Sequence, residues 1–119
     1  MGRRQLLPRI CFLLIAAWVG GCGGGGKATQ KEFELDFRGG ALPAEQQLIR
    51  VRQGDEVILR WSTDEPVEVH LHGYDIEKKL KPGTPTTMWF VAVATGRFPV
   101  TRHRNGEEAT LGYLEVYPR

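Results

Sequence analysis

The stretch VEVHLH, residues 67–72, alternates strictly between apolar and polar side chains. Successive side chains of an extended strand point to opposite faces, so we expect the valine and leucine side chains to face a core. Glu68, His70 and His72 then share the other face, and Gly73 directly after them permits a bend. The stretch therefore predicts a half-buried β-strand that carries two histidines.

The same period of two recurs on both sides of this stretch. Further strands are predicted at residues 33–37, 48–52, 57–61, 76–80, 88–93, 98–101 and 111–117. Gly54 lies in a turn between the second and third of the chain's strands, which predicts a hairpin there. Residues 41–47 have room for one helical turn, and no amphipathic helical stripe occurs. Seven or eight short strands predict an all-β Greek-key β-sandwich.

The N-terminus has the layout of a secretory signal, with Arg3, Arg4 and Arg9 before an apolar run at residues 10–19. A membrane-spanning helix is the competing interpretation. Such a helix needs about 20 consecutive apolar residues, whereas this run has ten and ends in glycines. We therefore expect residues 1–21 to be a cleaved signal peptide.

The sequence Val19-Gly20-Gly21-Cys22 resembles the lipobox of bacterial lipoproteins, in which the cysteine thiol is diacylated before cleavage. The alternative is an ordinary signal peptide with a chance thiol, but a free thiol in an oxidising compartment is a liability, and Cys11 lies in the leader. The resemblance implies lipidation of Cys22 on a membrane that faces the periplasm.

Three parts are therefore expected: the signal peptide, a lipidated cysteine with a glycine-rich tether at residues 22–30, and a domain at residues 31–119. The resemblance to lipoproteins slightly favours the outer membrane, because Gly23 replaces the aspartate that resembles an inner-membrane retention signal in enteric bacteria. The membrane is thus one expected partner.

Charge and length exclude several classes of function. Removal of the leader takes away three of the 16 basic residues and leaves 13 against 14 acidic ones, a net charge of −1. A surface of that charge offers no footprint for nucleic acid. The mature 98 residues leave little room for a catalytic cleft, and the chain carries no motif of a catalytic triad, a phosphate-binding loop or a metalloprotease. We do not expect an enzyme.

The chain has three histidines, and all are candidate metal ligands. His70 and His72 are about 7 Å apart along one strand face, and His103 falls in the polar stretch 102–108, which we expect to be a loop. Imidazole is a common ligand of copper and zinc. The alternative is that the three are solvent-facing polar residues.

Other potential ligands near the histidines have simpler explanations. Met88 is the first residue of the predicted apolar strand 88–93, and its side chain is expected in the core. The carboxylates of Asp75 and Glu77 could reach a metal ion, but acidic residues near a turn are usually just solvated.

The order of these signals resembles a cupredoxin, over residues 33–118. The resemblance is carried by Gly54-Asp55, by residues 69–75, 81–83 and 96–98, by Phe90, and by the closing strand 112–116. It implies a copper ion held by His70, with His72 as a competitor, and by His103. The family's cysteine position holds Val100, and Thr110 and Leu111 stand where its methionine is expected. A type 1 copper site is therefore not expected. The resemblance to cupredoxin-like domains without the cysteine leaves three alternatives: copper bound through histidines, another ligand, or no metal.

Two functions follow as hypotheses. The first is a lipid-anchored periplasmic cupredoxin-like protein that binds copper through His70, His72 and His103 for metal handling. The second is a metal-free interaction module that contacts an envelope protein through Tyr74, Tyr117 and the basic stretch 97–104.

Overall fold

Eight β-strands and one 3-10 helix make up residues 27–119, the part of the chain that this computed structural model describes. The elements are β1 (Gln30–Phe37), η1 (Ala44–Gln46), β2 (Leu48–Arg52), β3 (Glu56–Thr63), β4 (Val67–Leu71), β5 (Ile76–Leu80), β6 (Thr86–Val91), β7 (Gly96–Arg104) and β8 (Glu107–Tyr117). No helix among these residues is long and apolar enough to cross a bilayer. The predicted signal peptide, Cys22 and residues 23–26 lie outside the described residues.

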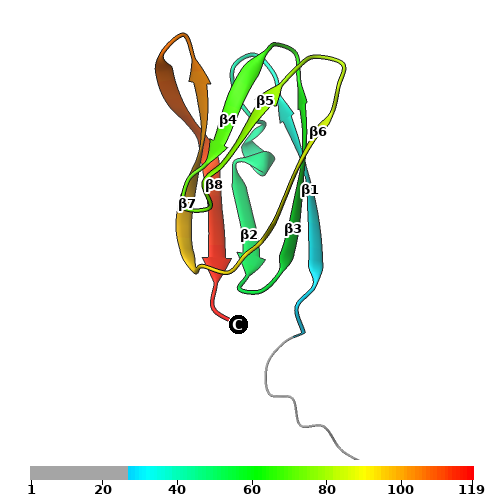
Figure 1. Cartoon of the computed structure of the whole chain (residues 1–119), viewed down its shortest axis with the longest axis vertical. Helices are drawn as coiled ribbons and strands as arrows, with labels where there is room; N and C mark the ends of the chain where they lie inside the picture. Colours follow the sequence, from blue (N-terminus) through cyan, green and yellow to red (C-terminus); the bar gives the residue numbers. More distant parts are fainter. Residues whose placement is uncertain (1–26) are drawn as a thin grey trace, which may run out of the picture.

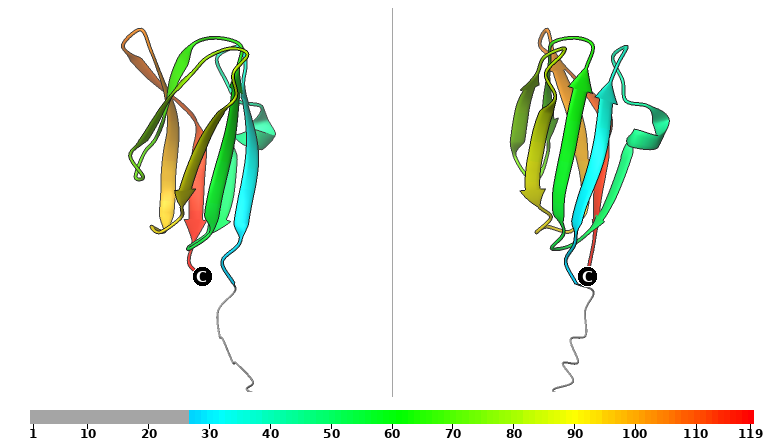
Figure 2. Two further views of the ribbon diagram at one scale, coloured as in Figure 1. Left: turned by 45° about the vertical axis from the view of Figure 1, so that its right-hand side comes forward. Right: turned by 90° about the vertical axis from the view of Figure 1, so that its right-hand side faces the viewer.

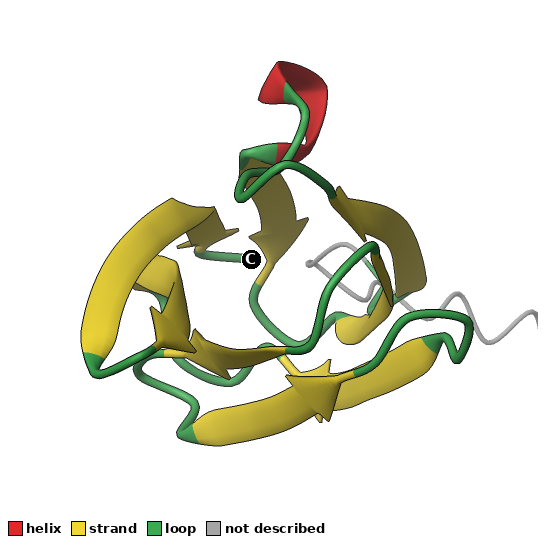
Figure 3. Cartoon of the chain, turned by 90° about the horizontal axis from the view of Figure 1, so that it is seen from above, coloured by secondary structure: helices red, strands yellow, loops and turns green. Residues whose placement is uncertain are grey.

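The strands form two sheets that pack face to face (Figures 1 and 2). One sheet has the order β1-β3-β6, and the other has the order β2-β8-β7-β4-β5. The pairs β1–β3 and β2–β8 are parallel, and the remaining pairs are antiparallel. Seen from above, the strands surround a common interior (Figure 3). The predicted all-β sandwich of seven or eight strands is confirmed.

Alternation along the strands builds the core between the sheets. In β4, Val67, Val69 and Leu71 are buried while the intervening polar residues are not, as the sequence pattern predicts. The largest fully buried side chain belongs to Trp61 of β3. Met88 of β6 is buried as well, which confirms its predicted role in the core.

The predicted hairpin between β2 and β3 was wrong, because the two strands lie in different sheets. Gly54, with φ +89°, turns the chain from one sheet to the other. Asp55 fixes this crossing, since its carboxylate is 1% exposed and accepts hydrogen bonds from the backbone N–H of Arg52 (2.9 Å) and of Thr29 (3.2 Å). These hydrogen bonds therefore attach the turn to the start of β1, while β2 and β3 do not pair with each other.

The two ends of the described chain lie at the same end of the sandwich (Figure 1). Arg119 joins them, because its Nη1 donates to the Lys27 carbonyl (2.9 Å), its Nε donates to the Gln53 carbonyl (2.8 Å), and its guanidinium pairs with Asp55. Residues 27–29, which the sequence assigned to the tether, are thus attached to the domain. We call this end the tether end.

Candidate metal centre

His70 and His72 lie side by side on the face of the five-stranded sheet that points away from the core. His70 belongs to β4, and His72 is the first residue of the turn that follows. The backbone N–H of His72 donates to the Pro99 carbonyl at 3.0 Å, which continues the pairing with β7. The two ring centroids are 4.1 Å apart. The predicted common face of the two histidines is therefore confirmed.

The turn after His72 depends on Gly73. Its φ of +82° lies in the left-handed region that side chains disfavour, and an added Cβ would come 2.2 Å from Cδ1 of Phe98. The backbone therefore passes against the Phe98 ring at a distance that only glycine allows. This close passage fixes where the chain leaves β4, and with it the position of the His72 ring.

His103 is part of a strand, so its predicted place in a loop was wrong. β7 runs to Arg104, and Asn105-Gly106, with φ values of 51° and 79°, form a two-residue turn into β8. Positive φ at both residues is typical of a tight hairpin turn. In this ladder His103 lies opposite Glu108 of β8, and on its other side opposite Glu68 of β4.

Three side chains form a group that could hold a metal ion: His70, His72 and Glu108. Nε2 of His72 is 2.7 Å from Oε1 of Glu108 and 3.0 Å from Oγ1 of Thr101, which is buried beneath the cluster. His103 lies at the margin, with its Nε2 3.8 Å from Oε1 of Glu108. We call His70, His72, His103 and Glu108 the histidine cluster.

The histidine cluster fits a metal ion in size. Ligand nitrogen and oxygen atoms about 2.0–2.2 Å from one ion cannot be more than about 4.4 Å apart. One ligand atom from each of His70, His72 and Glu108 lies within 4.8 Å of the others. Small side-chain rotations therefore suffice to bring all three atoms onto one ion.

A buried nitrogen without a partner supports this fit. The His70 side chain is 15% exposed, and its Nε2 atom is buried without a hydrogen bond to any described residue. The Oδ1 atom of Asp75 stands 3.6 Å away, beyond hydrogen-bond range. Leaving such an atom unpaired is costly, and a metal ion would satisfy it.

Glu108 brings negative charge to the two imidazoles. A hydrogen bond from the Thr101 hydroxyl, followed by one from His72, holds the pKa of the Glu108 carboxyl below its usual value. The carboxylate is therefore ionised at neutral pH and can act as an oxygen ligand.

Sequence reasoning named the three histidines but missed Glu108 and Thr101. The signal for Glu108 was the Asn105-Gly106 pair, because a two-residue turn there places residues 103 and 108 opposite each other. The carboxylates of Asp75 and Glu77 are not part of the group of His70, His72 and Glu108. Asp75 is almost fully exposed, and Glu77 lies opposite His70 on the edge strand β5.

The residue at the family's cysteine position, Val100, offers no ligand atom to a metal ion. Val100 faces the core, buried against the other sheet, so it does not point toward the histidine cluster. Residues 27–119 contain no cysteine.

The surface suggested for a metal-free module does not form as expected. The Tyr74 ring packs against Phe90 and Phe98, and its hydroxyl donates to the Ala94 carbonyl at 2.8 Å. The basic stretch 97–104 is strand β7 instead of a loop. Tyr117, by contrast, is exposed.

Comparison with known proteins places the fold. No protein-family model matches the chain, and neither does any curated protein sequence. A copper-binding protein solved in solution in its apo form is similar, with a TM-score of 0.61 and 14% identity over 77% of this chain and 92% of that one. A multi-copper oxidase from Pseudomonas thermotolerans has a TM-score of 0.60 and 23% identity over 78% of this chain. The described residues of this chain therefore have a cupredoxin-like fold.

The match to larger proteins is partial. The chain spans 64% of a similar chain of a heme-copper terminal oxidase, with a TM-score of 0.55 and 22% identity. It spans 31% of the multi-copper oxidase. These likenesses concern the fold, and they cover only part of the larger chains.

Proposed function

We propose that this chain is a lipid-anchored cupredoxin-like protein of the bacterial envelope that binds copper(II) through its histidine cluster. His70, His72 and Glu108 supply the ligands, and His103 stands close enough to assist. The observation that carries the proposal is the buried Nε2 atom of His70, which has no hydrogen-bond partner among the described residues and lies beside a second imidazole and a carboxylate.

The donor set favours copper(II) over other ions. Two imidazole nitrogens and one carboxylate oxygen suit borderline divalent metals, and affinity for such sites is highest for copper in the first-row series. Copper proteins among the similar folds support the same ion.

The ligand chemistry also favours metal handling over electron transfer. The described residues offer the ion no thiolate, so it would lack the covalent copper–sulfur bond of blue copper sites. A site on the outer face of a sheet exposes the ion to exchange with other proteins. Holding and passing copper at a membrane surface, without a catalytic step, is the role that we propose.

Titration tests the proposal directly. Residues 22–119 with Cys22→Ser would be stripped of metal and titrated with copper(II) by calorimetry, beside the double variant His70→Ala, His72→Ala. We expect one copper ion per chain, and a loss of affinity of about 100-fold or more in the double variant, because even outer partners of metal ligands change affinity about 10–100-fold.

A matched control is available in Glu107→Gln, which alters the residue beside Glu108 in the same hairpin and should leave binding unchanged. Thermal unfolding of each variant would show that the fold persists. Equal binding in the wild type and in the double variant would exclude the site and leave the metal-free interaction module as the better hypothesis.

A further inference from the structure

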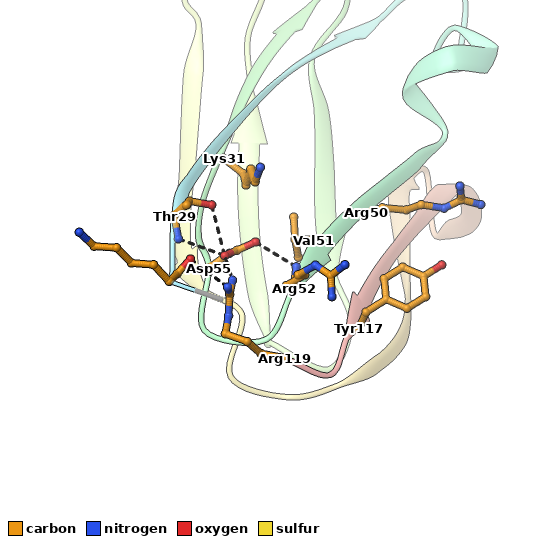
Figure 4. Close-up of a pocket in the computed structure, with 9 residues that line it drawn as sticks. Thr29, Lys31, Arg50, Val51, Arg52, Asp55, Tyr117 and Arg119 are labelled. Atoms are coloured by element: carbon orange, nitrogen blue, oxygen red, sulfur yellow. Dashed lines mark hydrogen bonds and ion pairs between the residues drawn. The ribbon is translucent and has the colours of Figure 1, made fainter. Parts of the chain in front are cut away.

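A basic pocket of about 390 Å³ opens at the tether end of the sandwich. Five cationic side chains line it: those of Lys27, Lys31, Arg50, Arg52 and Arg119. Figure 4 shows four of the labelled side chains, Lys31, Arg50, Arg52 and Arg119, arranged around Asp55 and Tyr117. Asp55 is the only acidic residue of the lining, so the pocket is strongly positive.

Several of these cations make no close ion pair. Arg119 pairs with Asp55, and Arg50 lies 3.5 Å from Glu115. Within residues 27–119, Lys27, Lys31 and Arg52 make no side-chain ion pair. Three cations are therefore available to an external anion.

Exposed apolar side chains gather at the same end. Five large apolar residues are exposed in the described part of the chain, and four belong to the tether end: Trp89, Val91, Val93 and Tyr117. Tyr117 and Val93 are both hydrogen-bonded to Gln53, in the turn before β3. The backbone N–H of Gln53 donates to the Tyr117 carbonyl, and its Nε2 donates to the Val93 carbonyl. Val93 is 66% exposed and Trp89 is 57% exposed.

Trp89 is hydrogen-bonded to this end of the sandwich: its indole N–H donates to the Glu56 carboxylate at 2.7 Å. Glu56 is the first residue of β3 and directly follows the buried Asp55. Cations together with exposed Trp and Tyr side chains at one end of a domain are the composition that proteins present to a bilayer interface.

We propose that the tether end docks on the anionic phospholipid headgroups of the membrane. This inference rests on the proposed function in one step: the lipid anchor on Cys22 brings the tether end close to the membrane. Five chain steps join Cys22 to Lys27, and they span about 18 Å at most. Since Lys27 is hydrogen-bonded to Arg119, an acyl chain on Cys22 holds the cationic pocket close to the headgroups.

Docking in this way orients the histidine cluster. The β7–β8 hairpin, which carries His103 and Glu108, lies at the end of the sandwich opposite the tether end (Figure 1). His70 and His72 lie beside the middle of β7, so the candidate metal centre is on the side of the docked sandwich, where a soluble partner or a free ion reaches it.

The test separates docking from lipidation. Residues 22–119 with Cys22→Ser, which cannot be acylated, would be mixed with vesicles of phosphatidylglycerol and phosphatidylcholine in equal parts, and with vesicles of phosphatidylcholine alone. Sedimentation measures the bound fraction, and the emission of Trp89 reports its environment, because the other tryptophan of residues 22–119, Trp61, is buried.

We expect binding to the anionic vesicles only, a blue shift of the emission, and weakening by salt. Lys31→Gln with Arg52→Gln should weaken binding about 30-fold, since each cation near an anionic membrane contributes about fivefold. The matched control is Lys78→Gln with Lys79→Gln on β5, which removes the same charge far from the pocket.

Equal weakening by both pairs, or equal binding to neutral vesicles, would overturn the docking surface. Neither result bears on copper binding or on acylation of Cys22, so the docking inference can fail while the proposed function stands. Acylation is tested separately, by mass spectrometry of the full chain from a bacterial membrane.

Discussion

Nε2 of His72 lies 2.7 Å from Oε1 of Glu108, although 36 residues separate them in the chain. A bulge in the β7–β8 ladder allows this contact. The register shifts between Val100 and Thr101, so that Leu111 is an extra residue in β8. Without that shift Ala109 would stand opposite His103, and the carboxylate of Glu108 would point to the other face of the sheet.

Glu108→Gln should weaken copper(II) binding by more than about tenfold, because an amide oxygen replaces an ionised ligand next to two imidazoles. Competition with a chromophoric chelator would measure the affinity. The neighbouring Glu107→Gln should keep the affinity of the wild type. If the two variants bind copper equally, Glu108 is not a ligand.

The strands were predictable because each one has a buried and an exposed face, and period-two alternation records that difference directly in β1 and β4. The partner of β2 was not predictable, since the Gly54 turn is compatible both with a hairpin and with a crossing between sheets. The choice depends on the burial of Asp55 against the first and last residues of the domain, which is a contact distant in sequence.

The candidate site was predictable only in part, for a related reason. His70 and His72 share a face through local geometry alone. Glu108 lies beside them because of the way β7 and β8 pair, including the bulge between them. The only local sequence signal for that pairing is the Asn105-Gly106 turn.

Asp55→Asn should destabilise the domain by about 2–4 kcal/mol, because the buried carboxylate accepts two backbone hydrogen bonds and pairs with Arg119. Urea unfolding followed by tryptophan fluorescence would measure the free energy of unfolding. Asp75→Asn, at an almost fully exposed carboxylate, is the control and should change it by less than about 0.5 kcal/mol.

The same residue predicts an acid-sensitive stability. Burial raises the pKa of the Asp55 carboxyl, but hydrogen bonds from Arg52 and Thr29 and the charge of Arg119 outweigh it, so the pKa is lowered on folding. The stabilisation is present above the unfolded pKa of about 3.9 and is lost as the pH falls through the lower folded value. The difference in unfolding free energy between wild type and Asp55→Asn should therefore shrink as the pH falls below about 4. A difference that stays constant from pH 6 down to about pH 2 would contradict this.

Gly73→Ala should destabilise the domain by about 2 kcal/mol or more, because its φ is positive and the new Cβ meets the Phe98 ring. It should also weaken copper binding, since the turn positions His72. Gly83→Ala is the matched control, with φ +79° and open space around the added Cβ. It should cost about 1 kcal/mol and leave copper binding unchanged. Thermal unfolding and copper titration of the pair measure both effects.

Electron paramagnetic resonance of the copper(II)-loaded chain is the measurement that tests the central claim most directly. The proposed site predicts nitrogen couplings from two imidazoles, an ordinary wide copper hyperfine splitting because no thiolate binds, and the loss of one coupled imidazole in His72→Gln. A spectrum unchanged by His72→Gln and by His70→Ala would contradict the claim, because the copper would then be bound elsewhere on the protein.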